Sequence, residues 1–193
     1  PNPSSPPVIG YLARIIPEKG LPVLVDAFIH LRNTLKHPDA RLHIARAATA
    51  GDSKLIGALK RQLTAAGLHD EVTWSPNISR EQKADMLSSL SIFSVPATYP
   101  EAFGLYLIEA LASGVPVVQP RASSFPEIIE GSGGGALVPP GDPIALANAW
   151  REVLGRPDLL QTFGEKGRHA AEHSYSVQAM RDRFLALATP LVP

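Results

Sequence analysis

Short apolar runs alternate with longer amphipathic segments along most of this chain. The runs are largely free of polar interruptions, which is the pattern of strands buried on both faces of a parallel sheet. They fall at residues 8–13, 41–47, 72–75, 92–95, 115–119 and 136–138. Between them, apolar residues recur at helical spacing, as at Leu24, Ala27, Phe28 and Leu31. The helices so predicted span residues 21–34, 53–66, 79–90, 103–112, 126–129, 143–154, 157–173 and 176–188.

The regular alternation of strand and helix predicts the fold class. It indicates an α/β domain, a doubly wound Rossmann-like parallel sheet of about six strands with helices on both faces. Ligands of such sheets bind beyond the carboxyl ends of the strands, near the point where strand order reverses. Arg14, Lys19 and Glu101 all follow predicted strand ends, so they should share one rim. The glycine-rich stretch 131–135 between two elements is expected to be flexible.

Composition narrows the class of protein. The chain has 193 residues, of which 45% are hydrophobic, so it can build a core. Its 18 basic and 18 acidic residues balance, which gives no indication of binding to nucleic acid or to an anionic membrane. It has no cysteine, so thiol catalysis and thiolate metal sites are excluded. Neither a membrane span nor a signal peptide is evident, and we expect a cytoplasmic location.

The stretch 100–116, PEAFGLYLIEALASGVP, holds two carboxylates around a very apolar predicted helix. Such a helix should be buried on several sides, so Glu109 within it needs a partner or a polar cleft. Glu101 lies just ahead of the helix, and Gly104 leaves its N-terminal N–H groups accessible to an anion. These features suggest a site for a polar, partly anionic ligand. A core helix with Glu101 as a cap and Glu109 satisfied within the core explains the pattern equally well.

Two motifs give the chain a family resemblance. One is Glu101-AFGLYLI-Glu109 followed by ALASGVPVV, and the other is the early loop Arg14-IIPE-Lys19-Gly20. From residue 8 to about 186, the chain resembles the C-terminal, donor-binding domain of a family-4 retaining glycosyltransferase of GT-B architecture (glycosyl transferases group 1). Residues 1–7, PNPSSPP, then resemble a linker, and 8–193 the nucleotide-sugar-binding domain, with an N-terminal acceptor domain missing.

The resemblance implies roles for particular residues. Arg14 and Lys19 would hold the donor diphosphate, for which a guanidinium fork and an ammonium are suited. Glu101 would bind hydroxyls of the donor sugar near the anomeric carbon, and is the implied catalytic residue. Glu109 would accept hydrogen bonds from the ribose hydroxyls. A solvated loop pair for the two cations, and a structural hydrogen bond for Glu109, are the alternatives.

The remaining implied contacts are made by the backbone. Phe103, Gly104 and Leu105 would present N–H groups to the donor sugar and phosphates. Ile78, which follows the third strand, would border the pocket for the base. Two segments depart from the family pattern: Ala13 replaces a glycine, and Ala45-Arg46-Ala47-Ala48 replaces a glycine-containing turn. His43 and His69 have no partners at metal-ligand spacing, so we expect them to be structural or surface residues.

The function implied is transfer of a hexosyl unit from a UDP- or GDP-sugar to an unknown acceptor, without cofactor or metal. The isolated fragment should be inactive, because part of the machinery would lie on the N-terminal domain, which could also make peripheral membrane contact. An exposed apolar stripe is expected on the final helices, about 157–188, where that domain docks. The alternative is a non-catalytic nucleotide-sugar-binding module. A dehydrogenase is disfavoured, because no G-x-G-x-x-G follows the first strand.

Overall fold

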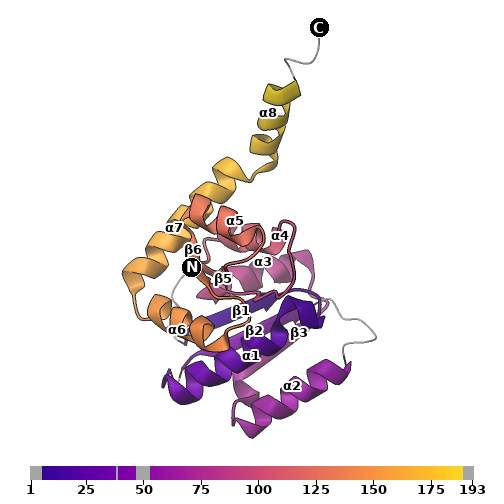
Figure 1. The fold of residues 1–193 in the computed structure, drawn as a ribbon, viewed down its shortest axis with the longest axis vertical. Coiled ribbons are helices and arrows are strands. Elements are labelled where there is room, and N and C mark those ends of the chain that lie inside the picture. Colours follow the sequence, from indigo (N-terminus) through magenta and orange to yellow (C-terminus); the bar gives the residue numbers. More distant parts are fainter. Residues whose placement is uncertain (1–5, 38, 47–52, 189–193) are drawn as a thin grey trace.

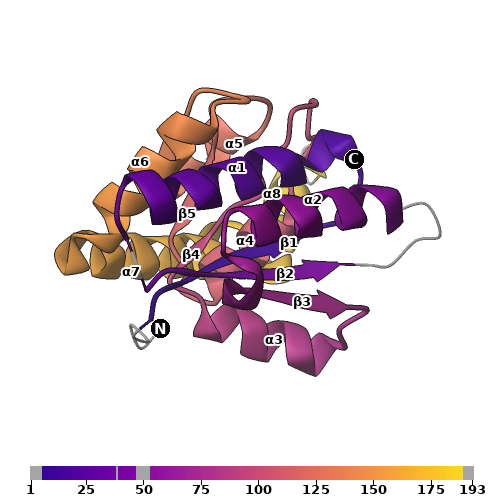
Figure 2. The same cartoon turned by 90° about the horizontal axis from the view of Figure 1, so that it is seen from below.

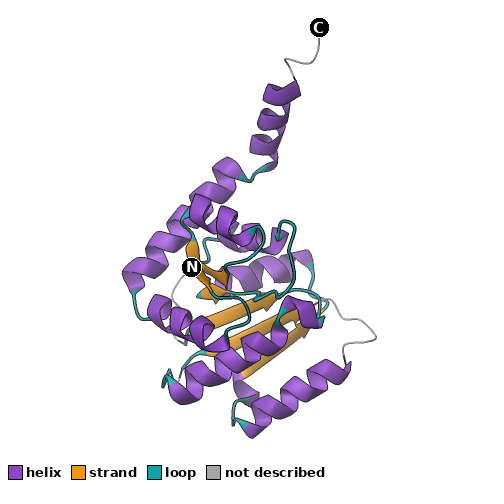
Figure 3. Cartoon of the chain, in the orientation of Figure 1, coloured by secondary structure: helices purple, strands orange, loops and turns teal. Residues whose placement is uncertain are grey.

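A computed structural model describes residues 6–37, 39–46 and 53–188. Within these ranges six strands form one sheet in which every pairing is parallel (Figure 1, Figure 3). The strands are β1 (Val8–Leu12), β2 (Arg41–Arg46), β3 (Val72–Pro76), β4 (Ile92–Phe93), β5 (Val117–Pro120) and β6 (Gly135–Val138). Their order is β3-β2-β1-β4-β5-β6, so the chain reverses direction across the sheet between β1 and β4. The predicted doubly wound fold is confirmed.

Helices cover both faces of the sheet (Figure 2). One layer contains α1 (Leu21–Ile29), α2 (Ser53–Ala65) and α6 (Pro143–Leu154), with α1 packed against the other two. The opposite layer contains α3 (Arg80–Ser89), α4 (Leu105–Ala112), α5 (Phe125–Ser132) and α7 (Pro157–Ser174). A π-helical segment, His30–Thr34, prolongs α1, and 3-10 turns occupy Pro17–Lys19 and His69–Glu71. The last helix, α8 (Val177–Ala188), projects away from the domain (Figure 1).

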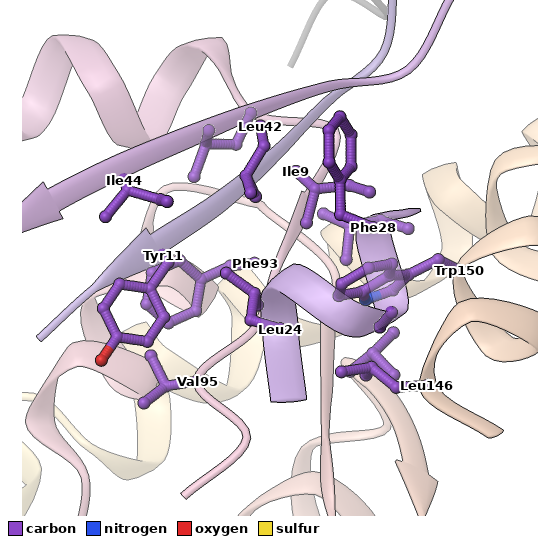
Figure 4. Close-up of a cluster of buried hydrophobic side chains, with 14 of the residues drawn as sticks. Ile9, Tyr11, Leu24, Phe28, Leu42, Ile44, Phe93, Val95, Leu146 and Trp150 are labelled. Atoms are coloured by element: carbon purple, nitrogen blue, oxygen red, sulfur yellow. The ribbon is translucent and has the colours of Figure 1, made fainter. Parts of the chain in front are cut away.

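The core between the sheet and the α1–α6 layer also fixes the segment that leads to the site. Figure 4 shows Tyr11, Phe93 and Trp150 among the aliphatic side chains that fill it. Trp150 is fully buried, and its Nε1 donates to Ser94 Oγ at 2.9 Å. Ser94 Oγ in turn donates to the Val118 carbonyl at 2.7 Å, so both polar groups are satisfied. The chain leaving β4 is thereby held in place.

Two predictions about this region are wrong. The stretch 131–135 is packed rather than flexible, because α5 continues to Ser132 and Gly135 already belongs to β6. A Cβ on Gly135 would lie 2.0 Å from the Val117 carbonyl oxygen, and one on Gly134 would lie 2.7 Å from Gly167 Cα. The glycines are therefore needed for close packing. The helix predicted from residue 103 begins only at Leu105, after Gly104 turns the backbone with φ +77°.

Several expectations concern the ends of the chain. Of the expected linker, residues 1–5 lie outside the described residues, as do residues 47 and 48 of the departing turn. The expected apolar stripe is present on α8, where Val177, Met180, Phe184 and Leu187 are all exposed. Among the described residues, no helix combines the length and apolarity needed to cross a membrane.

Candidate functional site

The loop after β1 is hydrogen-bonded to the segment after β4, at the point where strand order reverses. The Thr98 N–H donates to the Glu18 carbonyl at 2.8 Å. At Gly20 the backbone has φ +71°, and a Cβ there would lie 1.8 Å from the Pro96 carbonyl oxygen. The glycine of the Lys19-Gly20 motif is therefore required by this close approach. As a consequence Lys19 is brought against Glu101, 82 residues away in the chain.

Glu101 lies in a cluster of three donors. Lys19 forms an ion pair with its Oε2, and the hydroxyls of Tyr106 and Tyr99 donate to the same oxygen at 2.9 and 3.1 Å. The Lys19 ammonium also lies 5.0 Å from the Tyr99 ring centroid and 5.1 Å from that of Tyr106, within the range of a cation–π contact. The side chains of Lys19 and Glu101 are only 8% and 13% exposed. The two motifs of the sequence therefore meet in one nearly buried polar cluster.

The surroundings of Glu101 favour its ionised form. Partial burial raises the pKa of Glu101, but the hydrogen bonds from Lys19, Tyr106 and Tyr99, with the Lys19 charge, outweigh burial and hold the pKa below its ordinary value. Burial and the adjacent Glu101 charge raise the pKa of Tyr106, which keeps its hydroxyl a donor. The cluster is therefore a carboxylate acceptor held by fixed donors at neutral pH.

The N-terminus of α4 lies immediately after Glu101. Ser123 Oγ accepts from the Glu101 N–H at 3.1 Å, and Ser124 Oγ donates to the carbonyls of Glu101 and Phe103 at 3.2 Å each. The N–H groups of Phe103, Gly104 and Leu105 have no acceptor in the described part of the chain. Free N–H groups at a helix N-terminus are a binding site for anions.

The expectation that this helix is buried on several sides holds only for its later turns. Leu107, Ala110 and Leu111 are buried, but Phe103 is exposed and Leu105 is 69% exposed. The exposed residues belong to the start of the helix, whereas the buried ones lie in the turns of α4, which packs against α7. Apolar side chains are thus displayed beside the free N–H groups.

Glu109 is less buried than expected and has a partner that sequence reasoning missed. Its Oε1 forms an ion pair with Lys83 of α3, and the two side chains are 40% and 31% exposed respectively. Lys83 lies in the first turn of α3, after the Ser79 cap whose Oγ accepts from the Gln82 N–H. No spacing rule connects Lys83 to Glu109, 26 residues later, because only the packing of α3 beside α4 brings them together.

Arg14 and Ile78 are the remaining side chains that the sequence predicts for the site. Arg14 is exposed, and its guanidinium has no partner among the described residues. Ile78 borders a crevice of about 350 Å³ between α3 and strands β2 and β3. The crevice is lined by His43, Ser75, Ile78, Gln82, Asp85, Met86 and Ser89. It lies two strands away from the Glu101 cluster, and α3 connects the two regions through Lys83.

His43 is a structural residue, as expected from the sequence. Its Nε2 lies 2.9 Å from Ser75 Oγ, and burial lowers the pKa of His43, so the ring is neutral at physiological pH. It therefore contributes a polar edge to the crevice. No group of three or more potential metal-ligating side chains occurs in the ranges 6–37, 39–46 and 53–188.

The model of the family described as glycosyl transferases group 1 matches residues 1–170. The chain belongs to this family. A curated member, the MMP alpha-(1->4)-mannosyltransferase of Mycolicibacterium hassiacum, is 30% identical over 93% of this chain. That alignment spans 42% of the mannosyltransferase, so the chain corresponds to less than half the length of such a relative.

Solved structures of longer chains contain the same fold. Sucrose-phosphate synthase from Thermosynechococcus elongatus superposes with a TM-score of 0.83 at 28% identity, covering 96% of this chain and 45% of its own. HepE from Anabaena, solved in complex with UDP and glucose, superposes with a TM-score of 0.84 at 23% identity, covering 95% and 48%. The six-stranded domain is thus a unit that recurs within larger chains.

Proposed function

We propose that this chain is the donor-binding part of a glycosyltransferase. It moves a hexosyl unit from a nucleotide diphosphate sugar to an acceptor, with retention of configuration at the anomeric carbon. The observation that carries the proposal is the meeting of Glu101, Lys19 and the free N–H groups of α4 at the point where strand order reverses. Membership of the glycosyl transferases group 1 family supports it, as does the HepE complex with UDP and glucose.

The diphosphate lies between cations and backbone donors. Arg14 supplies an unpaired planar guanidinium at the exposed side of the rim. Lys19 keeps its pairing with Glu101, and its ammonium has three N–H donors, of which that carboxylate uses one. The N–H groups of Phe103, Gly104 and Leu105 bind the remaining phosphate oxygens or the sugar. These groups offset the diphosphate charge without a divalent metal or another cofactor.

The nucleoside extends from α4 toward α3. Glu109 accepts hydrogen bonds from the ribose hydroxyls, and its partial exposure leaves it accessible to them. The base then lies beside Ile78, in the crevice to which His43 and Ser75 contribute polar atoms. Uracil and guanine both present edges that these groups can bind, so UDP- and GDP-sugars are the donors to test.

Transfer of the hexosyl unit requires a second domain that holds the acceptor. A reaction in a cleft between two domains needs closure to bring the acceptor to the anomeric carbon and to exclude water. We place the acceptor site on an N-terminal domain, and the exposed stripe of α8 (Val177, Met180, Phe184 and Leu187) as the surface that docks on it. The isolated chain is then expected to bind donor and to transfer nothing. The cytoplasmic location stays a prediction.

The alternative function is a nucleotide-sugar-binding module without transferase activity. The ion pairs of Lys19 with Glu101 and of Lys83 with Glu109 are compatible with it. A fixed, ionised Glu101 would serve both functions, and membership of the glycosyl transferases group 1 family is what favours the enzyme.

Calorimetric titration of the chain with UDP- and GDP-sugars tests the donor site. We expect binding of at least one nucleotide sugar, and failure of all of them to bind would overturn the proposal. Incubation with the bound donor and a panel of acceptors tests the half-enzyme interpretation, with no glycoside product expected. Turnover by this chain alone would show that the acceptor site lies within it.

A further inference from the structure

The hydrogen bonds that the Glu101 carboxylate receives all fall on one of its two oxygens. Lys19, Tyr99 and Tyr106 all donate to Oε2. Oε1 receives no hydrogen bond from any described residue, although the side chain is only 13% exposed. An ionised carboxylate can accept about four hydrogen bonds over its two oxygens. Half of the acceptor capacity of Glu101 is therefore unused in a nearly buried position.

The two tyrosines are not needed to neutralise Glu101. Lys19 already supplies the opposite charge, but the three N–H donors of its ammonium rotate about the end of the side chain and set no single direction. The tyrosine hydroxyls add no charge, but each is carried by a rigid ring that approaches Glu101 from a different place. Tyr99 precedes Glu101 in the loop after β4, and Tyr106 follows it in the first turn of α4. Two donors on rigid rings fix the direction of a carboxylate.

We propose that Tyr106, together with Tyr99, positions Glu101 so that Oε1 accepts a hydrogen bond from a hydroxyl of the donor hexose. The two tyrosines are positioning residues, because they act on the sugar through Glu101. The inference rests on the proposed function, in which Glu101 lies beside the donor sugar. It goes further by assigning the sugar contact to one oxygen and the control of that contact to two side chains.

The proposal separates sugar recognition from nucleotide recognition. Within the described residues, the hydrogen bonds of the two tyrosine hydroxyls go to Glu101 and not to Glu109, and neither tyrosine lines the crevice beside Ile78, so binding of the nucleotide alone should not depend on their hydroxyls. Each ring also contacts the Lys19 ammonium, and substitution by phenylalanine keeps that contact while it removes the hydroxyl.

The experiment compares the affinities of the full chain for UDP and UDP-glucose by calorimetry. GDP and GDP-mannose replace them if the wild type binds the guanosine pair more tightly. The variants are Tyr99→Phe, Tyr106→Phe and the double variant. Tyr175→Phe is the matched control, since Tyr175 packs edge-on against Phe103 with ring centroids 6.5 Å apart and donates nothing to Glu101. Melting temperatures are recorded for every variant.

We expect the double variant to bind UDP within about twofold of wild type and UDP-glucose about tenfold more weakly, the loss of roughly one charge-assisted hydrogen bond. The affinity of each single variant for UDP-glucose should lie between those of wild type and the double variant, and the Tyr175→Phe control should bind both ligands as wild type does. Equal weakening of UDP and UDP-glucose, or no weakening of either, would overturn the inference while leaving the donor site intact. A wild type that binds UDP and UDP-glucose equally would also overturn it. If wild type binds no nucleotide at all, the proposed function itself fails.

Discussion

The two glutamates of the motif Glu101-AFGLYLI-Glu109 are chemically identical but are held in different ways. Glu101 is nearly buried and receives hydrogen bonds from three side chains on three segments of the chain. Glu109 is 40% exposed and is paired with a single lysine from the neighbouring helix. One carboxylate is held by several donors in a nearly buried position, and the other by a single partner at the surface.

The difference fits what each group is proposed to do. A carboxylate beside a reacting carbon must have a set direction, and fixed donors in a partly buried site provide it. A carboxylate that binds ribose hydroxyls needs only acceptor capacity and access. An exposed ion pair contributes little to stability, so the Lys83 pairing can be given up at low cost.

The largest contrast is expected from removing the lysine of each pair. Lys19→Met leaves a nearly buried carboxylate without its cation and should lower the free energy of unfolding by about 1.5–3 kcal/mol. Lys83→Met removes an exposed partner and should lower it by at most about 1 kcal/mol. Urea unfolding followed by circular dichroism measures both. Equal losses would contradict the view that the two pairs differ in kind.

Arg14→Ala should weaken nucleoside diphosphate binding without affecting the fold. Its guanidinium has no partner in the described part of the chain, so the free energy of unfolding should change by less than about 0.5 kcal/mol. Binding should weaken by about 1.5–3 kcal/mol, the range for charge-assisted hydrogen bonds. Calorimetry with the diphosphate and with the nucleoside alone separates the contributions. Arg156→Ala, an exposed arginine at the start of α7, is the control. Equal losses for both ligands would show that Arg14 does not bind phosphate.

Glu109→Gln should weaken ribonucleotide binding by about 1 kcal/mol, because the amide replaces only part of the acceptor capacity. The fold should survive, since the side chain is 40% exposed. Titration of wild type and variant with uridine diphosphate and its 2′,3′-dideoxy analogue measures the ribose contribution. Glu130→Gln, an exposed carboxylate paired with Arg121, serves as control. If the wild type binds uridine diphosphate and its dideoxy analogue equally well, Glu109 does not bind the ribose and its role is structural.

A smaller, pH-dependent effect is expected from Glu101. Its pKa in the folded protein lies below the unfolded value of about 4.3, so folding favours the ionised form. The stability that ionisation contributes is complete above the unfolded pKa and is lost as pH falls through the folded pKa. The difference in unfolding free energy between wild type and Glu101→Gln should therefore be constant above about pH 5 and shrink below about pH 4. A difference that grows on acidification would contradict the network around Oε2.

Removal of divalent metal is expected to have no effect on donor affinity. The sequence has no Asp-x-Asp pair, and Arg14, Lys19 and the start of α4 supply positive potential for the diphosphate. Donor affinity should be the same with EDTA as with magnesium or manganese. Affinity that EDTA abolishes and metal restores would contradict this.

The fold could be predicted because each element carries its own signal. Apolar runs indicated six strands, helical spacing and capping residues indicated the helices between them, and the strand ends predicted that Arg14, Lys19 and Glu101 share one rim. Local sequence patterns could not predict how closely these elements pack against one another. Gly134 and Gly135 resemble a flexible linker in the sequence, but the close approach of Gly167 and Val117 requires glycine there.

The site was predictable in its motif residues and not in their partners. Glu101 and Glu109 stand out because each is a carboxylate in or beside an apolar segment. Tyr106 and Tyr99 offered only a weak signal, two aromatic residues within five positions of Glu101. Lys83 offered none, because it pairs with Glu109 only through the way α3 and α4 pack. Side-chain partners of this kind depend on tertiary structure.

The most direct test of the donor site is a crystal structure of this chain with the nucleotide sugar that it binds most tightly. We expect the diphosphate between Arg14 and the start of α4, the hexose against Oε1 of Glu101, and the ribose on Glu109. The Lys83–Glu109 pair should be the contact that changes, while the donors to Oε2 of Glu101 stay in place. A nucleotide bound away from the rim formed by the β1 and β4 loops would contradict the assignment.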